Sequence, residues 1–359
     1  MKICFIAGAD SIHSKKWVEF FVQRGHKVFW ISLIPPLQGV IKNVNFYEMR
    51  GNFWRNIFRV KKLINEISPD IVHAHYAGKN GFLGAYSNFH PFVLTVWGDD
   101  VLFLPHSKIK GPLVRFAIRK ADLITCDAHH MKDVLIKLGV PQSLIRIVYF
   151  GIDTNKFSPG EKDIDLVNSL GLSEYNTVIS LRNFDPIYDL ETLIKAAPLI
   201  LKDVPNTKFI IIGHGPQEKM LKNLATSLKV SSSVKFIGRV PNEEIPGYLR
   251  ISDVYVSTSL SDAGIAASTA EAMACEVPVV ITNSGENDKW INDGENGFLV
   301  PVKNPQKLAE KVVYLLNHPE VRQTFGKRAR RLIVENNSYY KEMSKMEKIY
   351  SELLLRKSA

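Results

Sequence analysis

The stretch SDAGIAASTAEAMACEVPVV, residues 261–280, indicates how its half of the chain folds. It predicts a glycine-containing turn after a strand, then a helix, then another strand. The first turn of that helix carries only small residues, among them Ser268 and Thr269. Free N–H groups and the positive end of the helix dipole make such a turn an anion site. The stretch therefore predicts an α/β fold and a place for a negatively charged ligand.

Glu271 is the one acidic residue inside this predicted helix, which we expect to begin between Ala266 and Thr269. In the first turn its carboxylate could accept hydrogen bonds from the paired hydroxyls of a sugar. The alternative is a glutamate that only complements the helix dipole, which contributes less than about 1 kcal/mol. The residues of this stretch leave both interpretations open.

Strands and helices alternate on both sides of this stretch. Apolar runs of strand length are expected at 2–8, 26–32, 69–76, 91–98, 121–127 and 145–151 in the first half, and at 176–181, 207–213, 234–239, 253–258, 277–282 and 296–301 in the second. Helical patterns separate most of these runs, which predicts parallel, doubly wound sheets. The expected fold is α/β, with two Rossmann-like domains that face a cleft and with helices at the C-terminal end.

A polar loop, GIDTNKFSPGEKDID at 151–165, separates the two series of strands. We place the domain boundary near residue 170, with an N-terminal domain at 1–170 and a C-terminal domain at 171–335. Residues 336–359 are expected to form a helix that packs back on the N-terminal domain. A chain of 359 residues is long enough for two domains of ordinary size.

The positive charge of the chain lies in its first half. The formal net charge is +10; residues 1–160 hold 21 Lys and Arg against 11 Asp and Glu, whereas residues 161–359 hold 25 of each. An anionic membrane surface, a phosphorylated substrate or nucleic acid would fit this excess, and a solvated basic surface is the alternative. We expect no nucleic-acid binding, because the chain has no recognisable RNA-binding signature and its second half is neutral.

Targeting and redox signals are few. The N-terminal apolar run is too short for a secretory signal, and no apolar run reaches the length of a membrane span. Cys4, Cys126 and Cys275 are odd in number and widely spaced, which indicates reduced thiols and argues against a zinc site. We therefore expect a cytoplasmic protein, either soluble or bound peripherally at the inner face of a membrane.

Two glycine turns hold further candidate ligand residues. Gly8 ends the first strand, and the turn after it leads to His13, but the pattern lacks the second and third glycines of a dinucleotide fingerprint. Gly213 follows another strand within the sequence GHG, where a glycine permits close approach of a ligand. Each of these signals is weak alone, since many turns contain such glycines.

Arg182 directly follows the strand expected at 176–181. Its planar guanidinium suits a pyrophosphate, because two of its N–H groups can bind two oxygens at once. The alternative is a surface arginine that pairs with Asp185 or Asp189.

Across nearly its whole length the chain resembles the retaining glycosyltransferases of family 4, which have the two-domain GT-B fold. The similarity is greatest at VKFIGRVPNEEIPGYLRISDVYVSTS, AEAMACEVPVVIT and NDGENGFLVP, and it extends to RGHKVFWIS, PDIVHAHY, VLTVWGDD and GIDTNKFSP in the first half. The resemblance implies transfer of a sugar from a nucleoside-diphosphate sugar, with a UDP-sugar favoured. The anomeric configuration is kept and no metal is required. The implied acceptor is a glycan or a lipid-linked molecule in the synthesis of a cell-surface polysaccharide or glycoconjugate.

The resemblance also implies roles for single residues. Arg182 matches the family's phosphate-binding arginine, and Glu271 matches the glutamate that binds the nucleotide ribose. Arg239 and Val240 fall in the loop that frames the base. The residues implied for the donor site are Gly8, Arg182, Gly213, Arg239, Val240, Asp262, Ser268, Thr269 and Glu271.

The chain departs from the family pattern at several positions. Ala263 stands where the family often has a glutamate that touches the donor sugar, and the neighbouring Asp262 could replace it. Ile187 stands where the family often has a second cationic phosphate ligand, Lys289 where many members have a glutamate, and Trp97 where many have a histidine. Two alternatives therefore stay open: a nucleotide-sugar 2-epimerase of the same fold, and a non-catalytic protein that binds sugar nucleotides.

The resemblance implies that the first domain binds the acceptor. Trp97, Asp99 and Asp100 follow a strand of that domain and are expected to line the cleft, where a carboxylate could orient an acceptor. Trp97, Asp99 and His13 are the candidate catalytic residues, and His75 is an alternative to His13. No enzymic nucleophile is visible in the sequence.

The segment 53–67 predicts an amphipathic helix in this basic half. One face carries Phe53, Ile57, Val60, Ile64 and Ile67, and the opposite face carries Arg55, Arg59 and Lys62. The segment 106–120 adds a second basic run with apolar residues between the charges. We expect the apolar face to pack on the sheet and the basic face to meet an anionic membrane surface; an ordinary solvated face is the alternative.

Overall fold

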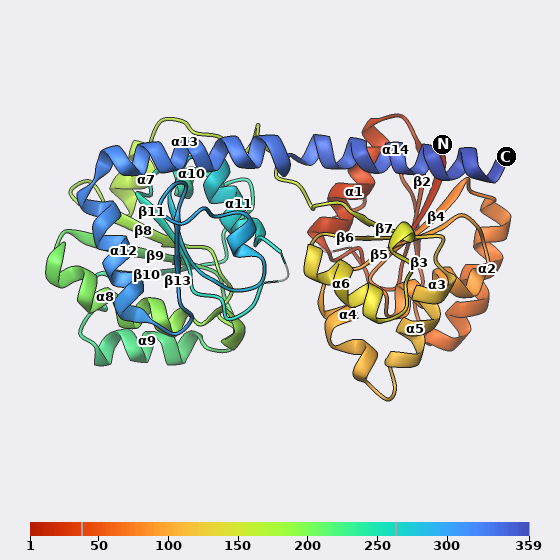
Figure 1. Cartoon of the computed structure of the whole chain (residues 1–359), viewed down its shortest axis with the longest axis horizontal. Coiled ribbons are helices and arrows are strands. Elements are labelled where there is room, and N and C mark those ends of the chain that lie inside the picture. Colours follow the sequence, from red (N-terminus) through yellow and green to blue (C-terminus); the bar gives the residue numbers. More distant parts are fainter. Residues whose placement is uncertain (37–38, 263, 359) are drawn as a thin grey trace. The chain divides into compact units, whose positions relative to one another are not determined.

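Two parallel β-sheets organise the chain in the computed structural model, which describes residues 1–36, 39–262 and 264–358 (Figure 1). Each sheet belongs to one of two compact units. The first unit comprises Met1–Phe150 with Tyr340–Ala359, and the second unit comprises Gly151–Tyr339. Parallel sheets with helices between their strands are what the alternating pattern predicts, and the expected α/β fold class is confirmed.

The first sheet has the strand order β3-β2-β1-β4-β5-β6-β7, and its neighbouring strands are parallel. The strands are β1 (Lys2–Ile6), β2 (Lys27–Ser32), β3 (Asn45–Glu48), β4 (Ile71–His75), β5 (Phe92–Thr95), β6 (Leu123–Cys126) and β7 (Ile145–Ile147). The order reverses between β1 and β4, so ligands are expected at the carboxyl ends of these two strands. The sequence did not predict β3, because its half-exposed side chains at the sheet edge form no continuous apolar run.

Helices of the first unit connect these strands. They are α1 (Ile12–Gln23), α2 (Phe53–Ile67), α3 (Lys79–Ser87), α4 (Asp99–Leu102), α5 (Gly111–Lys120), α6 (His129–Lys137) and α14 (Tyr339–Ser358), with the short 3-10 turns η1 (Leu104–His106) and η2 (Gln142–Leu144). The last helix packs on this unit: the Tyr350 hydroxyl hydrogen-bonds His73, and Arg24 pairs with Glu347 at 3.1 Å. None of the helices in the described ranges is long and apolar enough to cross a membrane.

The second sheet has the order β10-β9-β8-β11-β12-β13 and is also parallel throughout. Its strands are β8 (Asn176–Ser180), β9 (Thr207–Ile212), β10 (Val234–Gly238), β11 (Val254–Ser257), β12 (Val279–Thr282) and β13 (Phe298–Val300). Each of these strands falls within a run predicted from the sequence. The order reverses between β8 and β11, which places the expected ligand position of this unit at their carboxyl ends.

Helices cover both faces of the second sheet (Figure 1). They are α7 (Ile164–Ser169), α8 (Leu190–Asp203), α9 (Glu218–Ser227), α10 (Ile245–Arg250), α11 (Ala267–Ala274), α12 (Pro305–Asn317) and α13 (Pro319–Asn336), with the 3-10 turns η3 (Pro186–Tyr188) and η4 (Asn287–Lys289). α8 packs on both α9 and α12, and together they cover a core that includes Leu193, Phe209 and Ile211. Burial of each such side chain contributes about 1.5–3 kcal/mol.

The second unit begins earlier in the chain than the boundary near residue 170 that we expected from the sequence. It begins at Gly151, because the loop after β7 packs on this unit. Phe157 of that loop is fully buried, and Arg250 Nε donates to the Ser158 carbonyl at 2.9 Å. Although the loop is polar in composition, part of it therefore packs on the second unit.

Candidate functional site

Arg182 lies at the carboxyl end of β8 in the second unit and is held on three sides. Its Nη2 is 2.6 Å from Asp262 Oδ1, and its Nη1 is 3.4 Å from Ser268 Oγ. The guanidinium also lies over the ring of Tyr188, 4.2 Å from the ring centroid. Both members of the ion pair are buried, with side chains about one-tenth exposed. Arg182 thus pairs with Asp262 across the sheet switch point, and not with Asp185 or Asp189 as the alternative interpretation proposed.

The Nε–H of Arg182 takes no part in these contacts. Its Nε is buried and has no hydrogen-bond partner among the residues that the structure describes. A buried donor without a partner costs about 1–3 kcal/mol, so such a group is expected where a ligand supplies the acceptor. The donor and the positive charge together fit an anion.

The N-terminus of α11 lies beside Arg182, because Ser268 in its first turn contacts the guanidinium. The cap position is Ala266, and no side chain in the described part of the chain caps this end. The first N–H groups of a helix have no acceptor within the helix. Thr269 is buried, and its hydroxyl reaches that of Tyr255 at 3.5 Å, while Ser268 Oγ is 2.8 Å from the same hydroxyl.

Glu271 does not lie in the first turn of this helix, as we expected from the sequence. The helix begins at Ala267, so Glu271 is in the second turn, and the first turn carries no acid. The field of the helix dipole falls off within one turn, which weakens the interpretation that Glu271 only complements the dipole. The side chain is buried and lines a pocket of about 300 Å³.

That pocket brings together most of the residues expected at the donor site. It is lined by Leu181, Asn183, Ile212, Gly213, His214, Arg239, Val240, Ile245, Ser268 and Glu271. Arg182 and Asp262 adjoin it through Ser268, and Thr269 is the next residue of α11. Gly8 belongs to the first unit and lies outside this pocket. Ala263 falls outside the described residues.

Gly213 is required at its position by the chain itself. Its φ is +147°, and a Cβ there would come within 2.5 Å of the Arg182 carbonyl oxygen. The glycine therefore allows the turn after β9 to pack directly against the residue that holds the anion, in addition to leaving room in the pocket. A side chain at this position would push Arg182 out of place.

His214 was missed from the sequence, although it stands between the two glycines of the GHG turn. Its ring contacts Arg239, with the Arg239 Nε 3.0 Å from Nδ1. The pair closes the side of the pocket formed by the end of β10. The sequence signal that could have identified His214 was a polar ring in a strand-to-helix turn.

Lys289, another departure from the family pattern, pairs with Glu286 at 2.7 Å.

In the first unit, the turn after β5 carries two carboxylates, of which Asp100 is buried and Asp99 is exposed. Asp100 is buried and accepts N–H groups from Ala77 at 2.7 Å, Trp97 at 2.9 Å and Gly98 at 3.0 Å. Burial, with a smaller contribution from the Asp99 charge, raises the pKa of Asp100 to about 6 against three hydrogen bonds that lower it. The expectation that Asp100 lines a cleft was wrong: it joins the turns after β4 and β5.

Asp99 is exposed and points its carboxylate at a neighbouring turn. It accepts the Tyr76 hydroxyl at 2.7 Å. Tyr76 follows β4 with a φ of +77°, a conformation that a bulky residue rarely adopts. Burial and the nearby Asp99 raise the pKa of the Tyr76 hydroxyl, which keeps it protonated as a donor.

His13 lies beside Trp97, so two of the candidate catalytic residues of this unit are in contact. The centroid of the His13 ring is 5.6 Å from that of the Trp97 ring and 4.4 Å from that of the Phe150 ring. Burial and then the charge of Lys16 lower the pKa of His13 to about 4, so its ring is neutral at pH 7. His75 is fully enclosed against Trp17 and Trp97, and burial lowers its pKa to about 3, as expected of a packing residue.

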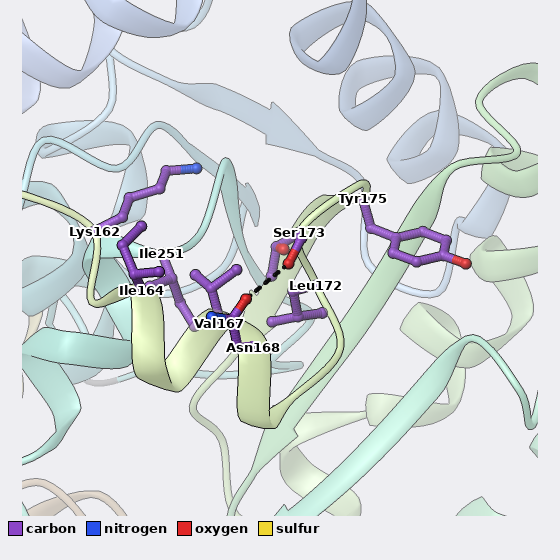
Figure 2. Close-up of a pocket in the computed structure, with 9 residues that line it drawn as sticks. Lys162, Ile164, Val167, Asn168, Leu172, Ser173, Tyr175 and Ile251 are labelled. Carbon is purple, nitrogen blue, oxygen red and sulfur yellow. Dashed lines mark hydrogen bonds between the residues drawn. The ribbon is translucent and has the colours of Figure 1, made fainter.

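Another hollow of the second unit, of about 310 Å³, lies away from these residues (Figure 2). It is formed by α7 and the start of β8, and Ser173 Oγ donates to Asn168 Oδ1 at 3.1 Å across its wall. Thr177 lies at the amino end of β8, whereas Arg182 follows the carboxyl end. Ligands of parallel sheets bind at the carboxyl ends, so this hollow is not a candidate donor site.

Comparison with known proteins identifies related families in both units. Residues 164–332 match the family described as glycosyl transferases group 1, and residues 2–128 match the family described as glycosyl transferase 4-like. Among curated proteins, the chain is 30% identical to the alpha-monoglucosyldiacylglycerol synthase of Acholeplasma laidlawii, over 92% of this chain and 90% of that protein.

Two further relatives have names that specify other substrates. The chain is 26% identical to the N-acetyl-alpha-D-glucosaminyl L-malate synthase of Bacillus anthracis, over 92% of this chain and 91% of that one. It is also 26% identical to a GDP-mannose-dependent alpha-(1-6)-phosphatidylinositol monomannoside mannosyltransferase of Mycolicibacterium smegmatis, over 77% and 75% of the two chains.

A solved structure shares the fold. The Anabaena protein HepE, crystallised with UDP, superposes with a TM-score of 0.83 at 20% identity, over 98% of this chain and all of that one. At this identity the similarity establishes the GT-B fold only.

Proposed function

Because the chain belongs to the family 4 glycosyltransferases and is a transferase that uses a sugar-nucleotide donor, we propose that its donor is a UDP-sugar. We propose that the sugar passes, with retention of its anomeric configuration, to a glycan or lipid-linked acceptor of a cell-surface polysaccharide or glycoconjugate. The UDP in the HepE crystal structure supports this choice of base, and the GDP-mannose in the name of a relative makes GDP the first competitor to test.

The observation that carries the donor site is the unpartnered, buried Nε of Arg182 beside the uncapped N-terminus of α11. A diphosphate placed there would accept from Arg182 and from the first-turn N–H groups, which supply positive charge without a metal ion. Its charge would compete with Asp262 for the guanidinium. Asp262, once released, would be free to accept a hydroxyl of the donor sugar.

The rest of the pocket fits a nucleoside. Glu271 is buried in its wall, and we assign its carboxylate to the two ribose hydroxyls. Arg239, Val240 and His214 also line the pocket, and we assign the base to their side. Gly213 and Ser268 lie nearest the diphosphate in this assignment, because one packs on Arg182 and the other hydrogen-bonds to it.

The acceptor is assigned to the first unit, at the turn after β5. Asp99 is the exposed carboxylate of that turn and would orient an acceptor hydroxyl. Trp97 and the neutral His13 form an adjoining aromatic surface on which a sugar ring can stack. We assign no covalent nucleophile. We also propose that the protein works in the cytoplasm at the inner face of a membrane, held by the basic surface of this unit.

The donor assignment is tested by calorimetric titration with UDP, GDP, ADP and CMP. We expect the wild type to prefer UDP, and Arg182→Ala to abolish measurable binding. Glu271→Ala should weaken UDP binding by about 10–100-fold, the loss expected when a charged hydrogen-bond acceptor is removed. Glu218→Ala, an exposed acid on α9, is the matched control.

Deoxygenated ligands sharpen the assignment of Glu271. UDP that lacks both ribose hydroxyls should bind the wild type as weakly as UDP binds Glu271→Ala, and the variant should no longer distinguish the two ligands. A variant that still distinguishes them would remove Glu271 from the ribose. Failure of the folded wild type to bind any of the four nucleotides would overturn the donor site as a whole.

A further inference from the structure

A hollow of the first unit is apolar and lies at its sheet switch point. It measures about 600 Å³, within the range of small-molecule sites. Gly8, which follows β1, and Tyr76, which follows β4, form its base. Its walls come from α2, α3 and the segment 104–113, and α3 packs against both α2 and α5 (Figure 1). The two basic segments that the sequence singled out, 53–67 and 106–120, therefore meet around one hollow.

The rim of this hollow carries large apolar side chains that face solvent. Trp54 at the start of α2 is 62% exposed, Ile109 before α5 is 85% exposed, and Ile34 after β2 is 44% exposed. Three separate segments thus place apolar groups at one opening. Single exposed apolar residues are ordinary, but a contiguous group around a cavity marks a binding surface. The apolar stripe of α2 that packs inward does not account for Trp54, which lies on the outward face beside Arg55.

Cations surround the same opening. Lys79 and Lys110 line the hollow, and no carboxylate occurs among the described residues that line it. The Lys79 ammonium lies over the ring of Phe53, 5.6 Å from its centroid, so its charge is held at the wall. Lys108 and Arg55 are exposed next to the rim residues Ile109 and Trp54. Among the neighbours of the lining, the Asp99 carboxylate is engaged by the Tyr76 hydroxyl. An apolar interior lined by two lysines matches a ligand with a hydrocarbon chain and an anionic head.

We propose that this hollow receives a hydrocarbon chain of an anionic phospholipid while the rim rests on a bilayer surface. Trp54 and Ile109 enter the interface, and the flanking lysines contact the phosphate groups. The inference deepens the acceptor side of the proposed function, on which it rests, because it brings the turn that bears Asp99 to the membrane where a lipid-linked acceptor would lie. It commits to a lipid in a membrane, as opposed to a soluble alkyl phosphate or a protein partner.

The experiment measures partition of the full chain into vesicles of phosphatidylcholine alone and of phosphatidylcholine with phosphatidylglycerol. We expect binding only to the anionic vesicles and a decrease at high salt. Ile109→Ser with Lys110→Glu should lower the partition by about tenfold or more, since it removes an apolar contact and reverses a charge at the surface. Ile136→Ser with Lys137→Glu, the same change at an exposed pair on α6, should leave the partition unaltered.

A second variant reports on insertion directly. Trp54→Phe should keep most of the vesicle binding but abolish the blue shift that vesicles cause in tryptophan emission, although four other tryptophans remain of the five. Equal partition of the two Ile–Lys variants would overturn the proposal. So would equal binding of both vesicle types, or binding of a short alkyl phosphate without any binding of vesicles.

Nucleotide titration of the same proteins separates this proposal from the donor assignment. The Ile109→Ser, Lys110→Glu variant should bind UDP as the wild type does, because its changes lie in the first unit. Loss of vesicle binding with UDP binding intact would be the expected result. A wild type that binds vesicles but no nucleotide would overturn the donor assignment alone, and one that binds UDP but no vesicles would overturn the lipid proposal alone.

Discussion

The two units place their candidate sites at the same point of the same topology and fill them with opposite chemistry. In the second unit a pocket of about 300 Å³ at the carboxyl ends of the strands adjoins a buried ion pair. In the first unit the residues after β1 and β4 form a hollow twice as large, with apolar walls and exposed lysines. A parallel sheet therefore determines where a ligand lies, whereas the turns alone determine what kind of ligand it is.

The two sites should also differ in how far their residues contribute to the stability of the fold as well as to ligand binding. Charges of the second-unit site are buried and depend on one another, so their loss should weaken both folding and binding. The rim of the first-unit hollow is exposed, so its loss should weaken binding alone. The following four predictions test this distinction.

The largest effect is expected from Arg182→Ala. The change leaves the Asp262 carboxylate buried without its partner, which should lower the free energy of unfolding by about 3–5 kcal/mol. Urea unfolding measures this loss, and Arg331→Ala, an exposed arginine of α13, should change it by less than about 0.5 kcal/mol. Removal of both partners in Arg182→Ala, Asp262→Ala should restore part of the stability but none of the UDP binding. Equal stability of the single and double variants would show that the pair is not coupled.

A pH dependence of stability is expected from Asp100. Its pKa of about 6 in the folded state lies above the ordinary value of 3.8, so the folded state binds the proton more tightly. The contribution of this group to stability is thus greatest below pH 4 and is lost as the pH rises through 6, by up to about 3 kcal/mol. Urea unfolding between pH 4 and 7 should show this trend as a difference between the wild type and Asp100→Asn.

The comparison with the variant is needed because buried histidines of the first unit, among them His13 and His75, titrate with the opposite sign. Burial lowers the pKa of His13 and His75 to about 4 and about 3, so their contributions grow as the pH rises. Both histidines are present in the two proteins and cancel in the difference. A difference that does not change with pH would mean that Asp100 titrates at its ordinary value.

A catalytic effect without a binding effect is expected from Asp99→Asn. The change keeps an acceptor for the Tyr76 hydroxyl but removes the charge that would orient the acceptor hydroxyl. We expect kcat to fall by about 100-fold, with the affinity for UDP unchanged because the donor site belongs to the other unit. Steady-state rates and calorimetry measure the two quantities, and Asp133→Asn on α6 is the matched control. An unchanged kcat would remove Asp99 from the catalytic residues.

The smallest effect on stability is expected from Trp54→Ser. The side chain is 62% exposed, so its removal should change the free energy of unfolding by less than about 0.5 kcal/mol. Thermal or urea unfolding checks this, with Ile57→Ser on the buried face of the same helix as the comparison. A loss at Trp54 as large as that at Ile57 would show that the rim belongs to the core and not to a binding surface.

The strands of the second sheet could be predicted because each is a mainly apolar run between polar turns; most are buried, and the edge strand β10 is half-buried but still mainly apolar in sequence. The edge strand β3 could not, since half of its environment is solvent. The start of α11 could be placed only to within a few residues, between Ala266 and Thr269, and the helix begins at Ala267. Small residues fit both the turn and the helix, and the backbone of Ala266 decides where the helix begins. With the helix beginning at Ala267, Glu271 lies in the second turn and not in the first turn, where it was expected.

The candidate site was predictable where it depends on local sequence and not where it depends on distant contacts. Arg182 was found because it follows a strand, but its partner Asp262 lies 80 residues away, and the acids nearest in sequence were the only partners that a local pattern suggests. Asp100 was expected to line a cleft because it follows a strand, where ligand residues of parallel sheets lie. Its three backbone contacts involve the turn after another strand, which no local pattern indicates.

Because α14 packs on the first unit, it affects the order in which the two units can fold during synthesis. Met343, Met346 and Tyr350 are fully buried, and Tyr350 lies against Phe21 with ring centroids 5.1 Å apart. A ribosome makes all of the second unit before it makes these residues. The nascent first unit must therefore wait with part of its core uncovered, while the second unit, contiguous from Gly151 to Tyr339, can fold as soon as it emerges. Chaperones that recognise exposed apolar surface would be expected to engage the half of the chain that is synthesised first.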